Sequence, residues 1–161
     1  MVGWDVAVEE GRSTVFKNIL VAIDGSKSST NALQAAAELS AKFGAELHIL
    51  HVVRDMQVPL NPGLMEAYEK LQRQRHDVLS SAGEQLIDQA KRSVEARGID
   101  AIKTDIGSGD PASAIVDYAV GNKIDLIVIG SRGLGQVRGM LMGSVSRKVS
   151  NITKAACLIV K

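Results

Sequence analysis

The sequence predicts an α/β fold, in which a parallel β-sheet is covered by helices on both of its faces. Short apolar runs rich in Val, Ile and Leu alternate along the chain with segments whose apolar residues recur at helical spacing. The apolar runs are continuous rather than interrupted by polar residues, which is typical of strands buried on both faces. Strands that alternate with helices favour parallel pairing through right-handed crossovers.

The first strand is expected over residues 17–23, a continuous apolar run that ends at the turn-forming segment Asp24-Gly25-Ser26. A helix is expected from Ser28 or Thr30, because apolar side chains then recur at helical spacing. Gly44 is expected to end this helix, since glycine readily adopts the left-handed conformation that closes many helices. Together these segments predict the first strand–helix unit.

The second strand–helix unit is expected over residues 45–98. Residues 45–53 form another continuous apolar run and predict the second strand. Prolines and a glycine then interrupt the chain between residues 59 and 63. The long amphipathic pattern that follows predicts a helix that ends at Gly98.

A weaker third strand is expected over residues 99–106. Asp110 and Pro111 predict the start of the third helix, because Asp caps helix N-termini and Pro is tolerated at the first helical position. This helix is expected to end at Gly121. The remaining elements are expected as a strand over residues 125–129, a helix from Gly143 or Ser144 to Ile152, and a strand over residues 156–160.

The composition is that of one soluble globular domain. The chain has 161 residues, of which 45% are apolar and 23% are charged, and its formal net charge is +1. No dense basic tract suggests a nucleic-acid surface, and no apolar run approaches the roughly 18 residues of a membrane span. The start of the chain lacks the pattern of an export signal, and Cys157, the one cysteine, is expected to be a small core residue that forms no disulfide. We therefore expect a cytoplasmic protein with an N-terminal arm over residues 1–15 and a domain over residues 16–161.

The pattern that says most about function follows the strand at residues 125–129. Gly130-Ser131-Arg132-Gly133 is separated by nine residues from Gly143-Ser144, where a helix is expected to begin. Glycines let backbone amides approach an anion, and a helix N-terminus adds unpaired N–H groups and the positive end of its dipole. Arg132 or Arg138 is placed to neutralise charge. The pattern predicts a nucleotide phosphate site; the alternative is a flexible loop whose glycines only turn the chain.

Two other strand ends are expected at the same edge, because the carboxyl ends of parallel strands meet there and ligands bind where the winding reverses. Asp24 ends the first strand, where its carboxylate would accept a hydrogen bond from a ribose hydroxyl or hold a divalent ion against phosphates. The alternative is an Asx turn that caps the next helix. Val52 and Val53 offer backbone groups to a base edge and an apolar face for stacking, although two valines taken alone indicate core.

Other chemistries lack their motifs. No Lys follows Gly143, so the chain has no Walker loop there, and a faint dinucleotide-like spacing from Gly133 lacks the acidic residue expected about twenty residues later. No Gly-x-Ser-x-Gly indicates a nucleophile elbow. His48 and His51 are expected on opposite faces of the sheet, and with His76 they do not make a metal site. Nothing in the sequence compels catalysis.

Together the motifs resemble the universal stress protein family, specifically its ATP-binding subgroup, over residues 17–161. The resemblance rests on the glycine spacing described above and on three further segments: residues 19–26, Leu50-His51-Val52-Val53 and Gly109-Asp110-Pro111. It implies a Rossmann-like fold of the adenine nucleotide alpha hydrolase type, with a five-stranded parallel sheet in the order 3-2-1-4-5. It also implies a homodimer, often paired through the last strand.

The resemblance implies ATP as the ligand, with Asp24 beside the ribose and phosphates and as the residue expected to hold any Mg²⁺. Val52 would present its backbone to adenine, and the glycine clusters would hold the phosphates. We expect nucleotide contacts at the following residues: Ala22, Asp24, Val52, Ile129, Gly130, Arg132, Gly133, Gly143, Ser144, Val145 and Ser146.

The family implies nucleotide sensing in stress adaptation, read by a regulatory protein partner, more readily than turnover. Efficient hydrolysis needs a group that positions water, and no such residue is evident beyond Asp24. Two alternatives remain open at this point. One is a dimeric scaffold that does not use nucleotide, and the other is a slow Mg-dependent ATPase.

Overall fold

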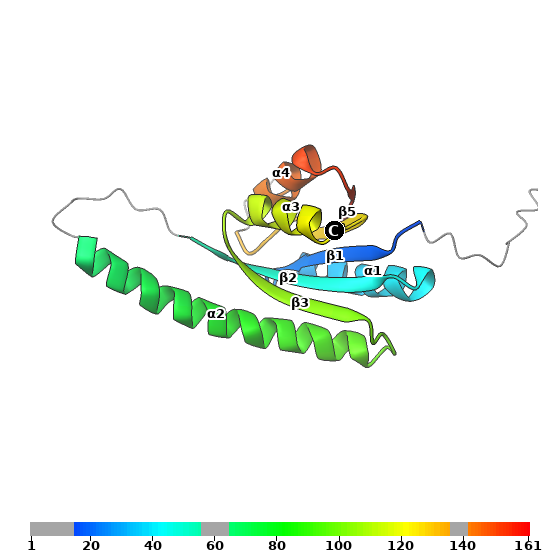
Figure 1. Ribbon diagram of the computed structural model, residues 1–161, viewed down its shortest axis with the longest axis horizontal. Helices are drawn as coiled ribbons and strands as arrows, with labels where there is room; N and C mark the ends of the chain where they lie inside the picture. Colours follow the sequence, from blue (N-terminus) through cyan, green and yellow to red (C-terminus); the bar gives the residue numbers. More distant parts are fainter. Residues whose placement is uncertain (1–14, 56–64, 136–141) are drawn as a thin grey trace, which may run out of the picture.

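The computed structural model describes residues 15–55, 65–135 and 142–161. Nearly all of the expected N-terminal arm and Arg138 lie outside the described residues. The described part contains strands and helices in strict alternation (Figure 1). In chain order they are β1 (Asn18–Ile23), α1 (Lys27–Phe43), β2 (Glu46–Arg54), α2 (Met65–Glu95), β3 (Ile102–Gly109), α3 (Pro111–Gly121), β4 (Leu126–Gly130), α4 (Ser144–Ile152) and β5 (Ala156–Val160).

The strands form one parallel sheet in the order β3-β2-β1-β4-β5, which confirms the expected fold and strand order. β1 lies at the centre, and its residues Ile19, Leu20 and Val21 are fully buried. Helices cover both faces of the sheet, and Figure 1 shows α3 and α4 on the side opposite α2. A strand covered on both faces has no polar side, which explains the continuous apolar runs in the sequence.

Two apolar cores lie on the two faces. On one face, Ile19 and Val21 pack with α1 and α2 through residues such as Ala36 and Ile87. On the other face, Leu20 and Ile127 pack with α3 and α4 through residues that include Ile115 and Val149. None of the helices in the described part of the chain is long and apolar enough to cross a membrane.

Capping side chains set where the helices begin. Ser26 caps α1 by accepting a hydrogen bond from the Ser29 amide at 3.2 Å, so this helix begins at Lys27 rather than at Ser28 or Thr30 as the sequence predicted. Gly44 ends α1 as predicted, with φ of 64°. Asp110 caps α3 through the Ser113 amide at 3.0 Å, and this start was also predicted.

The third strand is displaced from its prediction. The sequence predicted residues 99–106, whereas β3 begins at Ile102 and pairs with β2 up to Gly109. α2 ends at Glu95, before the predicted end at Gly98. Ile99 is apolar because it packs into the first core from the turn between the two elements, and its pattern therefore resembled a strand start. β3 is an edge strand with a largely exposed face, so its own apolar signal is weak.

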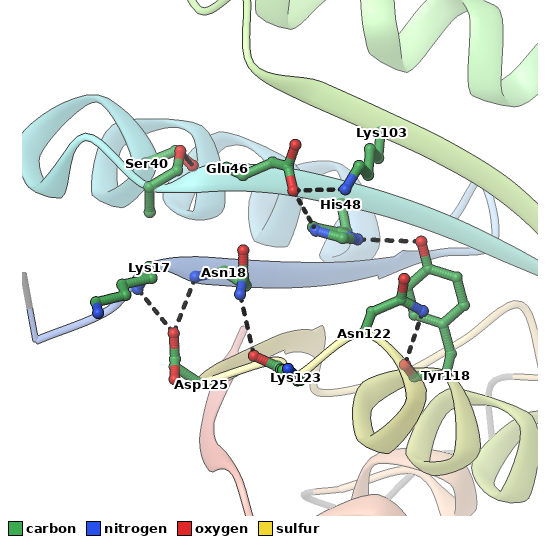
Figure 2. Close-up of polar contacts among 11 residues, drawn as sticks. Lys17, Asn18, Ser40, Glu46, His48, Lys103, Tyr118, Asn122, Lys123 and Asp125 are labelled. Atoms are coloured by element: carbon green, nitrogen blue, oxygen red, sulfur yellow. Dashed lines mark hydrogen bonds and ion pairs between the residues drawn. The ribbon is translucent and has the colours of Figure 1, made fainter.

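Polar contacts fix the amino-terminal edge of the sheet (Figure 2). The Asp125 carboxylate accepts hydrogen bonds from the backbone amides of Lys17 and Asn18 at 2.7 and 2.9 Å, which joins the start of β1 to the start of β4. The buried His48 ring bonds to Tyr118 of α3 and to Glu46, each at 3.1 Å. These contacts lie at the end of the sheet away from the strand carboxyl termini.

Candidate functional site

A cavity of about 550 Å³ lies at the carboxyl edge of the sheet. Pairing between β1 and β4 ends at Ala22 and Ile129, and the chain's winding reverses between these two strands. A crevice at this switch point is where open α/β sheets bind ligands. All the residues for which nucleotide contacts were expected line this cavity, namely Ala22, Asp24, Val52, Ile129, Gly130, Arg132, Gly133, Gly143, Ser144, Val145 and Ser146.

The two glycine clusters, 130–133 and 143–144, meet at the carbonyl group of Ser131. The Gly143 amide donates to this carbonyl oxygen at 2.7 Å, and the Ser146 hydroxyl lies 3.1 Å from it. The Ser131 amide in turn donates to the Val160 carbonyl of β5 at 2.6 Å. The end of β4, the start of α4 and the end of β5 are thus joined at one point of the cavity wall.

α4 begins at this point and presents its amino-terminal end to the cavity. Gly143 is the N-cap and supplies no side-chain hydrogen bond to the first turn. The first-turn N–H groups have no partner within a helix. Ser144, Val145 and Ser146 therefore offer amides and the positive end of the helix dipole to an anion. The sequence also offered the Ser146 hydroxyl as a donor to phosphate. In the structure this hydroxyl is buried and donates to the carbonyl oxygens of Ser131 and Gly143, which leaves the backbone amide of Ser146 for an anion.

Gly130 is required by close packing. A Cβ atom there would lie 2.7 Å from the Ser28 carbonyl carbon and 2.8 Å from the Ser29 amide nitrogen, both of which belong to the α1 backbone. The absence of a side chain lets the end of β4 pass against the amino end of α1. The predicted role of Gly130 in admitting an anion stays a prediction, and the nearest neighbour of this glycine in the structure is the start of α1.

Asp24 joins the end of β1 to the glycine-containing loop. One carboxylate oxygen accepts the Ser26 amide at 3.0 Å, which is the Asx turn that the sequence offered as an alternative role. The other oxygen accepts the Leu134 amide at 3.2 Å. A Cβ at Gly133 would lie 2.6 Å from this second oxygen, so glycine is needed for the loop to reach Asp24.

Serines at the start of α1 hold the same loop from its other side. The hydroxyls of Ser26 and Ser28 both donate to the Arg132 carbonyl oxygen. The loop backbone is thereby fixed while the Arg132 side chain stays exposed. An exposed guanidinium at the cavity wall is free to approach a phosphate.

The opposite end of the cavity is formed by the end of β2. Pairing between β1 and β2 stops at Ile23 and His51, so the edge of β2 that faces β1 has no strand partner beyond that point. Val52 turns its backbone groups to that edge, whereas those of Val53 face β3, and both residues line the cavity. Backbone groups without a strand partner are suited to read the edge of a base, and the valine side chains still pack into the cores.

The structure adds residues that the sequence did not indicate. Arg54, Arg75 and Leu79 also line the cavity, the last two from α2. With Arg132, the arginines outnumber the single carboxylate Asp24 among the charged lining residues of the described chain. The sequence shows that Arg75 and Leu79 are one helical turn apart. It does not show that α2 passes beside the cavity, because that depends on how the helix packs on the sheet.

Two of the three histidines lie in β2. His48 and His51 lie on opposite faces of β2, as expected from strand alternation: His48 contacts Tyr118 of α3, and His51 approaches Gly83 of α2. Burial lowers the pKa of His48 below its ordinary value. Across residues 15–55, 65–135 and 142–161, no three His, Cys, Asp or Glu side chains are grouped to hold a metal ion. Cys157 packs half-buried against the second core, and burial raises the pKa of its thiol.

Comparison with known proteins assigns the chain to a family. The sequence model of the universal stress protein family matches residues 16–161. Universal stress protein YxiE of Bacillus subtilis is 36% identical over 149 residues, which are 91% of this chain and 100% of YxiE. The chain therefore belongs to the universal stress protein family.

Solved structures agree with this assignment. A universal stress protein in complex with cAMP is 27% identical, with a TM-score of 0.68 over 91% of this chain and 98% of that one. The structure of MJ0577, a protein of Methanocaldococcus jannaschii, has a TM-score of 0.78 at 24% identity over 91% of this chain and 96% of that one, and shows the shared fold.

Proposed function

We propose that this protein binds an adenine nucleotide, ATP, in the cavity at the carboxyl edge of the sheet and acts as a nucleotide-dependent regulatory homodimer in the stress response. The observation that carries the proposal is the meeting of the two glycine clusters beside the amino end of α4. The family relative in complex with cAMP supports an adenine nucleotide as the ligand class. We place this function in the cytoplasm, as the sequence led us to expect.

In this proposal the triphosphate lies between the loop that starts at Gly130 and the first turn of α4. The backbone amides of this loop and of the first turn that have no protein acceptor would bind the phosphates, and the Arg132 side chain would add positive charge. The ribose lies beside Asp24, and the adenine lies against the unpaired edge of β2 at Val52. The order of these groups along the cavity follows the order of the strands β4, β1 and β2.

Asp24 could bind Mg²⁺ in addition to its two hydrogen bonds with backbone amides. Each of its oxygens accepts one amide bond, which leaves lone pairs for a further partner. Mg²⁺ bound to nucleotides usually takes one or two carboxylates together with phosphate oxygens and water. The ion would screen phosphate charge there. Hydrolysis needs a residue that positions the attacking water, and among the described lining residues we find no candidate for this besides Asp24. We therefore propose a binding protein with at most slow hydrolysis.

The proposed homodimer uses β5. This strand lies at the edge of the sheet. Its Leu158 side chain is 38% exposed, and Ile152 at the end of α4 is 48% exposed. An open edge with apolar side chains favours pairing with another strand. A second copy related by two-fold symmetry would pair the two β5 strands and cover these side chains.

Replacing Gly143 by Asp tests the phosphate site. Asp is a good N-cap and is compatible with the extended backbone at this position, and a Cβ there meets its nearest neighbour at 3.4 Å, an ordinary contact. The helix should stay intact or gain stability. The new carboxylate would take up first-turn amides and repel the phosphates, so we expect the affinity for ATP, measured by isothermal titration calorimetry, to fall by about a hundredfold or more.

Gly143→Ser is the matched control, because it caps the same helix without adding charge. It should keep most of the affinity. The phosphate site is placed wrongly if Gly143→Asp binds ATP as tightly as the wild type. A wild-type protein that forms a stable dimer and gives no heat with ATP would favour the scaffold alternative.

A further inference from the structure

The amino-terminal half of α2 contributes no buried residue to the cores. The buried residues of this helix, Gly83, Ile87, Ala90 and Val94, all lie in its second half. Figure 1 shows the amino-terminal end of α2 extending beyond the strands. Partly buried positions nevertheless continue into the first half at helical spacing, at residues 68, 72, 75 and 79. The same face of the helix therefore passes from the sheet to the cavity.

A close contact fixes how α2 sits on β2. A Cβ at Gly83 would lie 2.7 Å from Cδ2 of His51, so glycine allows the helix to approach the strand at this point. The His51 ring is held in turn, because its Nδ1 donates to the Ile23 carbonyl oxygen at 2.9 Å. One helical turn before Gly83 lies Leu79, which lines the cavity. The contact between Gly83 and His51 thus sets the height of α2 above the end of β2.

Arg75 is held over the end of β2. Its Nη1 donates to the Arg54 carbonyl oxygen at 3.1 Å, and its side chain is partly buried and lines the cavity with Leu79. Arg54 follows Val52 by two residues, so this guanidinium belongs to the base end of the proposed site. The phosphate end, at Gly130 and Gly143, is formed by other elements.

The chemistry of this position suits a purine. The bond to Arg54 uses only one of several N–H donors, and a guanidinium has a flat face that stacks on aromatic rings. Purines present a larger ring face than pyrimidines and carry the acceptor N7, which pyrimidines lack. Leu79 supplies an apolar neighbour for the same ring.

We propose that Arg75 is a specificity-determining residue that recognises the base of the bound nucleotide and favours purines over pyrimidines. The inference rests on the proposed function, since it assigns a role within the nucleotide site. It makes the first half of α2 a wall of that site. The first half of α2 buries no core residue, and the proposal gives it a function in selecting the ligand.

Binding of ATP and of CTP to the wild type and to Arg75→Gln tests the inference. The two nucleotides share ribose and triphosphate, so any effect on the phosphates cancels in the ratio of their affinities. We expect the wild type to prefer ATP, and Arg75→Gln to lose about tenfold in ATP affinity with little change for CTP. Arg75→Lys keeps the charge without the flat group and should also lose the preference.

Arg73→Gln is the matched control on the same helix, because Arg73 is 76% exposed and pairs with Glu69 at 3.3 Å. It should leave both affinities unchanged. The inference is overturned if the wild type binds CTP as tightly as ATP, if Arg75→Gln keeps the wild-type ratio, or if it weakens both ligands equally. Each of these three outcomes would still leave a protein that binds nucleotide. A wild type that binds neither ATP nor CTP would overturn the proposed function as well.

Discussion

Asp24 combines a structural and a proposed ligand-binding role in one side chain. Its oxygens accept the amides of Ser26 and Leu134, so it joins the α1 cap to the loop that would hold phosphate. The alternative readings of this residue from sequence, an Asx turn or a ligand contact, are therefore compatible. A carboxylate that organises a loop also keeps its remaining lone pairs for an ion or a hydroxyl.

Asp24→Asn separates these roles. The amide side chain keeps an oxygen for hydrogen bonding but loses the charge that favours Mg²⁺. We expect ATP affinity measured with Mg²⁺ to fall by about tenfold, and the affinity measured with EDTA to change less. Equal losses in the two conditions would show that Asp24 acts only by holding the loop.

At the scale of elements, α4 is oriented by its contact with α3. Lys148 of α4 donates to Asp110, the N-cap of α3, at 2.7 Å. The hydrogen bond from Lys148, followed by those from Ser113, lowers the pKa of Asp110 from 3.8 to about 2. Because the pKa is lowered in the folded state, this pair favours the fold above pH 3.8, and its contribution is lost as the pH falls towards 2. The group is exposed, so the effect on overall stability is small.

Lys148→Met should raise the pKa of Asp110 towards 3.8, because the largest cause of its lowering is removed. Carboxyl carbon chemical shifts followed through an acid titration measure this directly. Lys148→Arg should keep the pKa low. An unchanged pKa in Lys148→Met would mean that the α3 cap alone sets it.

The elements differ in how well the sequence predicted them. β1 and β4 were placed nearly to the residue, because a strand buried on both faces leaves a continuous apolar run. β5 was also placed nearly to the residue, because its sequence is an unbroken apolar run although it is an edge strand. β3 was misplaced, because its sequence is largely polar and exposed, and because the apolar Ile99 lies before the strand and packs into the first core. The predicted start of α1 lay too far along the chain, because Ser26, rather than a later residue, caps the helix.

At the scale of the whole molecule, strand order brings the cavity together. β1 and β4 are distant in sequence and adjacent in the sheet, so the residues at their ends meet only after folding. The lining residues at the glycine clusters and at the end of β1 could be predicted from sequence, because each belongs to a local sequence pattern. The contribution of Arg75 could not, because it depends on the approach of α2 to β2 at Gly83.

Assembly is the second property of the whole molecule that can be tested. Leu158→Lys places a charge on the exposed side of β5, where we propose that the partner copy pairs, and should give a monomer by native mass spectrometry. Val120→Lys is a matched control, because Val120 is 70% exposed on α3 and lies on another element. A wild type that is already monomeric, or a Leu158→Lys protein that stays dimeric, would contradict pairing through β5.

The most direct test of the nucleotide site is a titration of isotope-labelled protein with ATP and Mg²⁺, followed by backbone amide chemical shifts. We predict the largest changes at the amides of Gly130 to Gly133 and Gly143 to Ser146, with smaller changes at Val52. Saturating ATP that leaves these amides unshifted, or that shifts another surface instead, would contradict a phosphate site formed by the two glycine clusters.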